Sequence, residues 1–277
     1  MWRPEVWSLR QFKQQLTGQS PYLLRLGQAF MQLWRFNGHG WVQIGCLPVH
    51  HLGHDQYQAI ADLLPGLTQA LPLGASVQVL ADSKWMPVSL LNTGKAPLSR
   101  NQVDVLAKHR FAQIFGESAN HWTIQTSYVA GDAQAMAFGC PAGLQACLRQ
   151  SLEAQQPNGR GKYCFTGLAP TLSWAWNEAW RAHVGQAGSW LVLAEHDRSI
   201  LVWASKGQAS ALQPAGPILL NPAQVNQLLK TESLRCGVVE ETCAVLGTSF
   251  EDLPSMKPPH MPEGFQWRVF EVVESAT

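Results

Sequence analysis

The pattern of apolar and polar positions near the start of the chain predicts a β-meander. Three runs rich in aliphatic and aromatic side chains follow one another, at residues 22–27, 29–36 and 41–48. Periodicity alone leaves the middle run open to a helical interpretation. The pair Asn37-Gly38 behind it is a strong signal for a tight hairpin turn and favours strands. A second turn is expected at Gly27.

The middle of the chain alternates between predicted strands and predicted helices. Strands are expected at 77–81, 87–91, 122–128, 134–138 and 163–166, and helices at 56–64, 100–115, 141–154 and 171–182. The helix 100–115 has the clearest boundaries, because Ser99 and Gln102 match a capping box and Gly116 follows its last apolar residue. The strands 122–128 and 134–138 are close enough in sequence to form a hairpin.

The second half of the chain begins with a pattern like that of the first. Its predicted elements are strands at 190–194, 199–204 and 242–246, and a helix that begins at Pro222. A turn at Lys206-Gly207 precedes a weaker third strand, and Gly247 is expected to form a turn after the late strand. Each half therefore consists of a strand, a tight turn, a long strand and a glycine turn, followed by further α/β material.

Composition and charge narrow the class of protein. A length of 277 residues suits two lobes better than one core, and 46% hydrophobic residues indicate a folded chain. The formal net charge is +1 and no run of basic residues occurs, which argues against nucleic acid and against an anionic membrane surface as partners. The sequence shows neither a signal peptide nor a membrane-spanning run, so the six cysteines are expected to be reduced thiols in a cytoplasm.

Residues that bind metals do not form a recognised pattern. The closest cysteine pairs have six intervening residues, more than the usual spacing of zinc ligands. His50, His54 and Asp55 form a histidine-containing cluster, but Gly53 weakens the helix that would align them. A solvated loop is the favoured interpretation, and no metal site is predicted.

Two other features have weak chemical signals. The run Gly159-Arg160-Gly161-Lys162 partly matches a phosphate-binding loop but lacks the Ser or Thr that should follow, so a turn is favoured. Glu117, Asp132 and Glu195 are isolated carboxylates, for which a solvated surface is the default expectation. No catalytic residues are predicted from these patterns.

The duplicated meander and the order of elements between them resemble a known group of proteins. Duplicated meander-plus-helix halves are the plan of ribonuclease-H-like, actin-type ATPases. Within the first half, the order of strands and helices and the stretch from Ala107 to Gly116, with Trp122 behind it, resembles the pilus-assembly PilM family. It is also similar to the cytoplasmic domain of the type II secretion L protein. The resemblance covers roughly residues 22–250.

The resemblance implies an α/β fold with two ribonuclease-H-like, actin-like lobes and a small α/β subdomain inserted in the first. The implied division is an N-terminal arm at 1–20, a first lobe at 21–184 with the inserted subdomain at about 85–140, a second lobe at 185–253, and a Pro-rich tail with a last strand at 254–277. The join is expected near 183–189.

The resemblance also locates a degenerate nucleotide site. Such families carry Asp-x-Gly turns that approach the phosphates and orient Mg²⁺. Here Arg25 stands where the first acid belongs, although Gly27 is kept, and Glu195 begins a second turn without the glycine. Such families also carry a pair of glycines late in the chain, and only Gly247 is present here. A cation in place of an acid argues against Mg-ATP hydrolysis, but Arg25 is able to contact a phosphate directly, so residual ATP binding stays open.

The functional expectation is a non-catalytic scaffold of a pilus or secretion inner-membrane assembly platform. It would be cytoplasmic, without a cofactor or a membrane span of its own, and would bind a cytoplasmic peptide segment of an inner-membrane pilus or secretion protein. His109, Arg110 and Trp122 are the candidate partner-binding residues. The alternative is a nucleotide-dependent phosphotransferase of the same superfold.

Overall fold

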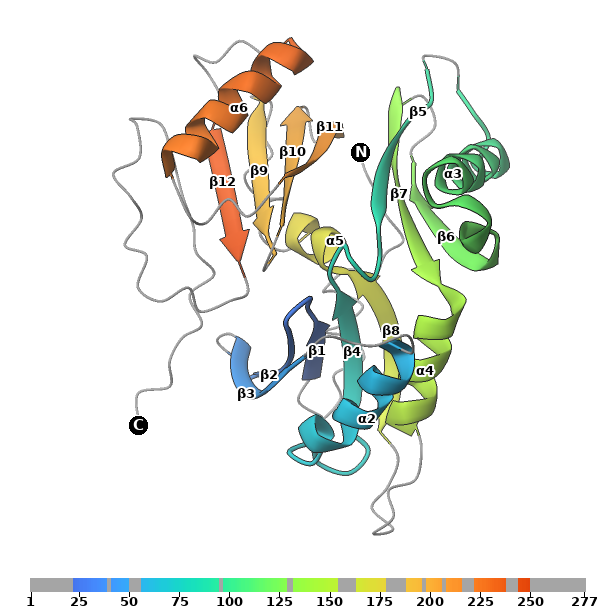
Figure 1. Ribbon diagram of the computed structural model, residues 1–277, viewed down its shortest axis with the longest axis vertical. Coiled ribbons are helices and arrows are strands. Elements are labelled where there is room, and N and C mark those ends of the chain that lie inside the picture. Colours follow the sequence, from blue (N-terminus) through green and yellow to red (C-terminus); the bar gives the residue numbers. More distant parts are fainter. Residues whose placement is uncertain are drawn as a thin grey trace.

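The computed structural model describes most of the chain between residues 22 and 249. The described residues are 22–38, 41–49, 56–94, 97–128, 132–153, 163–177, 188–195, 198–205, 208–215, 222–237 and 244–249. The expected N-terminal arm, the histidine-containing cluster, the loop 159–162 and the tail 254–277 lie outside these residues. Three sheets organise the described part of the fold (Figure 1).

The first sheet has five strands and contains the predicted meander. Its strands, in the order β3-β2-β1-β4-β8, are β1 (Tyr22–Leu26), β2 (Phe30–Phe36), β3 (Trp41–Pro48), β4 (Ser76–Ala81) and β8 (Cys164–Pro170). The first three are antiparallel, as the Asn-Gly signal predicted, whereas β1, β4 and β8 are parallel. The predicted meander is confirmed. Strand β8, predicted at 163–166, extends to Pro170.

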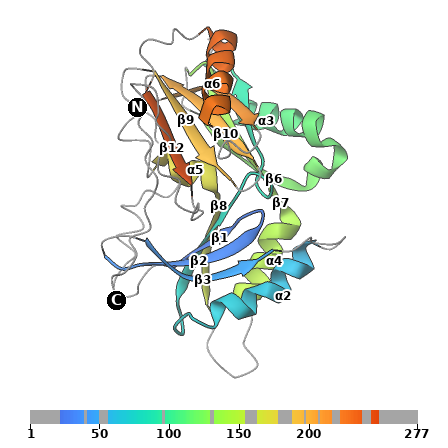
Figure 2. The ribbon, with the colours of Figure 1, turned by 60° about the vertical axis from the view of Figure 1, so that its left-hand side comes forward.

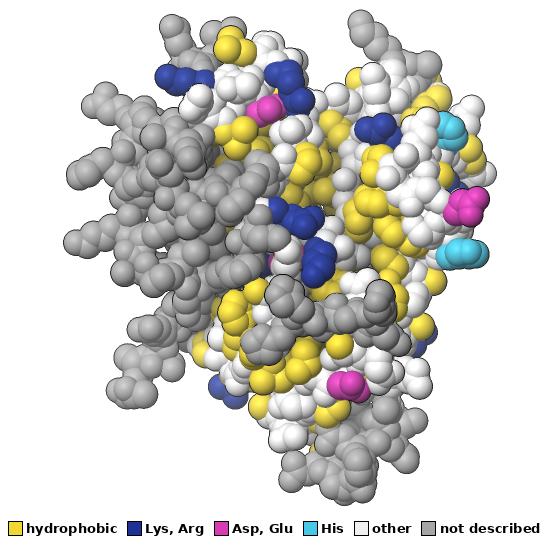
Figure 3. All heavy atoms as spheres, in the orientation of Figure 1, with side chains coloured by type: hydrophobic (Ala, Val, Ile, Leu, Met, Phe, Trp, Pro, Cys, Tyr) yellow, Lys and Arg dark blue, Asp and Glu magenta, His cyan; other side chains and the backbone are white. Residues whose placement is uncertain are grey.

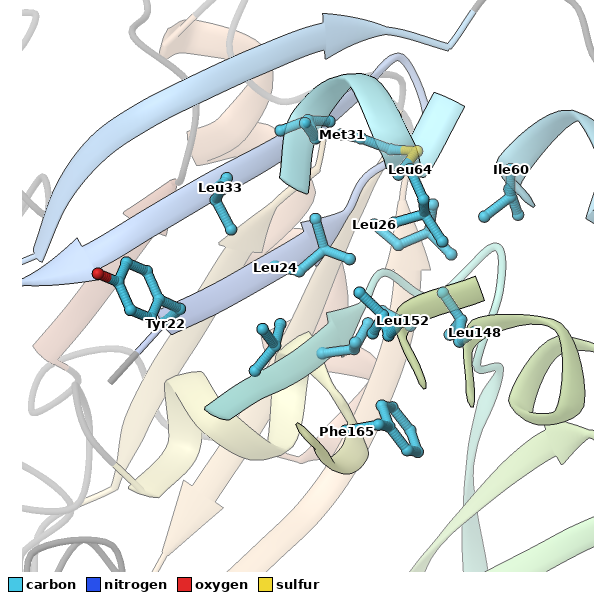
Figure 4. Packing of buried hydrophobic residues seen from close by; sticks show 14 of the residues in the cluster. Tyr22, Leu24, Leu26, Met31, Leu33, Ile60, Leu64, Leu148, Leu152 and Phe165 are labelled. Carbon is cyan, nitrogen blue, oxygen red and sulfur yellow. The ribbon is translucent and has the colours of Figure 1, made fainter. Parts of the chain in front are cut away.

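Two helices cover one face of this sheet, α2 (Gln56–Thr68) and α4 (Ala142–Glu153). Because successive strand residues point to opposite faces, Leu24 and Leu26 face these helices, while Leu23 and Arg25 face the other way. Figure 4 shows Leu24 and Leu26 of β1 packed toward Leu148 of α4. The helix side of the sheet is therefore an apolar core, and Arg25 lies on the opposite side.

The second sheet repeats the strand order of the first. Its strands, in the order β11-β10-β9-β12, are β9 (Ser189–Ala194), β10 (Ser199–Ser205), β11 (Gln208–Ala215) and β12 (Ala244–Ser249). As in the first sheet, a three-stranded antiparallel meander is extended by a parallel partner of its first strand. Helix α6 (Pro222–Cys236) packs on one face of this sheet (Figure 2). Its residue Leu229 lies in one buried cluster with Trp190 and Val192.

The third sheet is small and antiparallel, with β5 (Val88–Asn92), β7 (Gln134–Pro141) and β6 (Trp122–Ser127) in that order. Helix α3 (Arg100–Phe115) and the 3₁₀ helix η1 (Gly116–His121) cover its outer face. The predicted capping box is confirmed, because the Ser99 side chain accepts from the backbone N–H of Gln102 and the Gln102 side chain accepts from the N–H of Ser99.

The inner face of the third sheet packs against the second sheet. Phe138 of β7 shares one buried cluster with Leu191 of β9 and Val202 of β10, and helix α5 (Thr171–Ala175) adds Leu172 to it. These segments belong to different lobes in the division expected from the sequence, yet they bury apolar surface together. Helix α5 begins at the predicted residue, Thr171, and runs to Ala175, and residues 178–182 of the predicted helix lie outside the described residues. None of the described helices is both long enough and apolar enough to cross a membrane.

Candidate functional site

The candidate site lies where the ends of strands from the first and second sheets meet. In Figure 1 the arrowheads of β4 and β9 point toward each other near α5. Strand β1 is parallel to β4, and Leu26 at its end lies opposite Ala81. Asp82 follows β4 directly and its backbone N–H donates to the carbonyl of Leu26 at 3.1 Å. Side chains at the ends of these strands therefore converge.

Arg25 and Asp82 form a buried, bidentate ion pair at this position. The Arg25 Nη2 lies 2.7 Å from Asp82 Oδ2, and its Nε donates to Oδ1 at 3.1 Å. Both side chains are fully enclosed, with relative exposures of 1% and 0%. The planar guanidinium matches the carboxylate in geometry as well as in charge, so each compensates the burial of the other.

Three more polar side chains complete the network around this pair. Thr171, the first residue of α5, donates its hydroxyl to Asp82 Oδ1 at 2.7 Å. Arg25 Nη1 donates to the Gln32 side-chain oxygen at 3.0 Å, and the Gln32 amide donates to Gln43 at 3.1 Å. Both oxygens of Asp82 therefore accept hydrogen bonds from protein groups. Mg²⁺ requires carboxylate oxygens that are open to the metal or to its waters, so this network competes directly with metal coordination.

Gly27 is held in the turn that follows Arg25. Its N–H donates to the carbonyl of Phe30 at 2.9 Å, and its own carbonyl accepts from the Trp85 indole at 2.9 Å. A Cβ at this position would come within 2.7 Å of the Phe30 carbonyl oxygen. The glycine is thus required to close the turn between β1 and β2, whether or not a phosphate approaches it.

Glu195 is buried, contrary to the default expectation for an isolated carboxylate. It follows β9, and its relative exposure is 1%. One carboxylate oxygen accepts from the backbone N–H of Ser83 at 2.9 Å, and the other pairs with the Ser83 hydroxyl. The expectation of a solvated surface was wrong because Ser83, distant in sequence, supplies two donors to the carboxylate.

The surroundings of Glu195 favour its protonated form. Burial, and secondarily the negative charge of Asp82, raise the pKa of Glu195 to about 7. The two Ser83 hydrogen bonds and the positive charge of Arg25 act in the opposite direction and offset part of this rise. The carboxyl group is thus placed to change its charge within the physiological pH range.

The structure brings three of the four predicted nucleotide-site residues together. Arg25 and Gly27 join Glu195 through the intervening pair Asp82-Ser83, which sequence analysis missed. Gly247 lies inside β12, where it pairs with Val192, and does not form the predicted turn. One sequence signal does mark Asp82 and Ser83, because polar residues directly after a parallel strand gather at the edge of a sheet where ligands bind.

The three predicted partner-binding residues belong to the third sheet and its helix. His109 and Arg110 are exposed on α3. Trp122 begins β6 and is half-buried, with its ring centroid 4.9 Å from that of Phe115 and 6.1 Å from that of Phe111. The two basic residues are available to a partner, whereas Trp122 also anchors α3 to the sheet.

Two observations bear on the kind of ligand that this molecule could bind. Figure 3 shows Lys and Arg side chains near the middle of the visible face, at the level of α5, and acidic side chains at other places on that face. Among the described residues, no group of three or more His, Cys, Asp and Glu side chains is arranged to hold a metal ion.

Comparison with known proteins identifies the fold. No protein-family model and no curated protein matches the chain. A Bacteroides thetaiotaomicron protein of actin-like ATPase fold and unknown function superposes with a TM-score of 0.58 at 10% identity, over 84% of this chain and 83% of that one. A chain of the PilM–PilN type IV pilus biogenesis complex gives 0.52 at 12% identity, over 81% and 80%.

A third similar structure is the cytoplasmic domain of EpsL, an inner-membrane component of the Vibrio cholerae type II secretion system. It covers 90% of this chain and 88% of its own length at 12% identity, with a TM-score of 0.47. At these identities a structural likeness establishes the fold alone, and a TM-score below 0.5 adds nothing to it. The mixed five-stranded sheet, the repeated strand order and the first two superpositions together show that this chain has an α/β actin-like fold.

Proposed function

We propose that this chain is a non-catalytic cytoplasmic scaffold of a pilus or secretion inner-membrane assembly platform, and that it binds a peptide segment of a membrane partner. The observation that carries the proposal is the Arg25–Asp82 pair. An actin-like ATPase needs open acidic groups at the strand ends to orient Mg²⁺ and its waters. In this chain the first acid is replaced by a cation, and that cation occupies both oxygens of the neighbouring carboxylate.

The architecture behind this proposal is two actin-like lobes, at 21–184 and 185–253, with a subdomain inserted at about 85–140. The repeated strand order of the first two sheets supports the duplication. The third sheet, with α3 and η1, is the inserted unit, since β5, β6 and β7 lie in the chain between β4 and β8 of the first sheet.

The similarity to PilM supports the class of function. The matched PilM is part of a type IV pilus biogenesis complex with PilN, so a protein of this fold is found in an assembly of that kind. A scaffold needs a stable surface rather than turnover, and the Arg25–Asp82 pair neutralises its own charges without a bound nucleotide.

Purified protein is expected to show no magnesium-dependent ATP hydrolysis above the level of a buffer blank. The reason is that the Asp82 and Glu195 oxygens already form hydrogen bonds with protein groups, which leaves no open carboxylate oxygen among these two groups for a metal. The measurement is steady-state phosphate release with and without Mg²⁺. Steady turnover that disappears in an Arg25→Ala or a Gly27→Ala variant would contradict the scaffold proposal.

The proposed partner surface is the exposed side of α3, with Arg110 as its test residue. Reversing this charge by Arg110→Glu is expected to weaken co-purification of an inner-membrane partner by roughly tenfold, as loss of a charge pair in an interface does. The measurement is quantitative pull-down from detergent-solubilised membranes. Lys230→Glu, an equivalent reversal at an exposed position of α6, is the matched control and should leave the partner yield unchanged.

The two outcomes that count against this surface are distinct. A partner retained equally by wild type and by Arg110→Glu would show that the site lies elsewhere on the molecule. A partner lost equally from both charge reversals would show that the effect is one of general charge. Trp122→Ala is a poor first variant, because the Trp122 ring packs against Phe111 and Phe115.

A further inference from the structure

The contact between Ser83 and Glu195 joins two sheets that are separate in the strand topology. Ser83 follows Asp82 at the end of β4 in the first sheet, and Glu195 follows β9 in the second sheet. Two polar groups of one residue, the backbone N–H and the hydroxyl, meet the two oxygens of one carboxyl group. The geometry is that of a closure between the two halves of the molecule.

The charges around this closure do not balance when Glu195 is ionised. The charged side chains that act on it, among the described residues, are Arg25 from β1 and Asp82 from the end of β4. Arg25 and Asp82 already neutralise each other through two short contacts. An ionised Glu195 therefore leaves one uncompensated negative charge in a buried cluster, and such a charge is costly away from water.

Two other charged residues in the described part of the chain, Lys84 and Arg198, lie close in sequence to Ser83 and Glu195 and make different contacts. Lys84 is exposed and its Nζ lies over the Trp85 ring, 5.1 Å from the ring centroid. On the hairpin of Glu195 itself, the carbonyl of Arg198 accepts the Glu195 backbone N–H at 2.8 Å, which closes the turn. Neither contact is an ion pair with the Glu195 carboxylate.

We propose that Ser83 and Glu195 form a proton-sensitive latch, which holds the ends of β4 and β9 together while the Glu195 carboxyl group is protonated and loosens when it ionises. In the closed state one oxygen accepts the Ser83 N–H and the protonated oxygen donates to the Ser83 hydroxyl. In the open state the carboxylate is hydrated. The latch concerns how the two halves are held and does not depend on the identity of any partner.

The direction of the pH effect follows from the two states of Glu195. In the open state the carboxyl group has its ordinary pKa of 4.5, and in the closed state burial raises the pKa to about 7. Closure is therefore fully favoured below the ordinary pKa and weakens as the pH rises toward 7. Above about pH 8 both states are ionised, and no further weakening is expected.

The Ser83 backbone amide reports directly on the latch, because its N–H donates to the Glu195 carboxyl group. The experiment is hydrogen exchange of the full chain, measured by NMR between about pH 5 and pH 8 and corrected for the intrinsic pH dependence of exchange. Ser83 protection is expected to fall by roughly tenfold or more between about pH 5 and pH 7. The Asp82 amide, which donates to the backbone carbonyl of Leu26, is the internal control and should change by less than about twofold.

Glu195→Gln is the matched variant, since its neutral amide can accept from the Ser83 N–H and donate to the Ser83 hydroxyl as the protonated carboxyl group does. Ser83 protection in this variant is expected to be independent of pH. An equal pH-dependent loss in wild type and variant would overturn the proposal, and so would pH-independent protection in wild type. If the variant does not fold, the two amides of the wild-type protein provide the test. A loss of protection that is equal at the Ser83 and Asp82 amides would overturn the proposal.

Discussion

Replacement of Arg25 by alanine is expected to lower the free energy of unfolding by about 3–5 kcal/mol. The change leaves Asp82 as a buried carboxylate that keeps the Thr171 hydroxyl but loses both guanidinium contacts. It also removes the guanidinium N–H group that donates a hydrogen bond to the Gln32 side-chain oxygen. The measurement is urea unfolding at neutral pH, followed by circular dichroism.

Two further variants make this result specific to the ion pair. Arg100→Ala removes an exposed guanidinium at the start of α3 and should change stability by less than about 0.5 kcal/mol. The double variant with Arg25→Ala and Asp82→Asn should lose less stability than the sum of its two single changes, by about 1 kcal/mol or more. Strict additivity of the two changes would show that the pair is not coupled and would remove the main support for a self-neutralised site.

Phe138→Ala is expected to destabilise the protein by about 3–5 kcal/mol. Phe138 belongs to β7 of the third sheet, yet it is buried against Leu191 and Val202 of the second sheet. Truncation leaves a cavity between two sheets that both carry regular hydrogen bonding, so neither collapses easily into the space. The same unfolding experiment measures the effect.

The matched control for Phe138 is Val105→Ala on the outer side of α3. Val105 is 67% exposed, so its truncation should cost less than about 0.5 kcal/mol. If Phe138→Ala costs no more than this control, the third sheet is not held on the second by the cluster described above, and the inserted unit would then be attached chiefly through its chain connections.

The sequence predicted local features of the fold well, because they depend on neighbouring residues. The Asn37-Gly38 turn fixed the antiparallel pairing of β2 and β3, and the capping residue Ser99 fixed the start of α3. The strand predicted at 242–246 begins two residues later than predicted, as β12 at Ala244, and Gly247 lies within this strand rather than in a turn. A glycine that follows apolar residues fits both situations, so only the pairing with β9 decides between them.

The candidate site was predicted in part, and the missing part depends on distant contacts. Arg25 and Gly27 were found because the family pattern places an acid and a glycine there. The partners of Arg25 and Glu195 were not found, since Asp82 and Ser83 lie 57 and 112 residues away from them in sequence. The burial of Glu195 has the same origin, because a lone carboxylate becomes a buried one only when a remote segment supplies its donors.

The cluster shared by the second and third sheets also sets an order of events during synthesis. The inner side of β7 is complete once residue 141 has been made, but its apolar contacts in β10 end only at Ala204. At typical elongation rates of about 5–20 residues per second, Phe138 and Met136 wait roughly 3–13 seconds for their partners. During that interval the nascent third sheet presents an apolar face to solvent. A chaperone that binds nascent chains would therefore find an extended apolar target on this sheet.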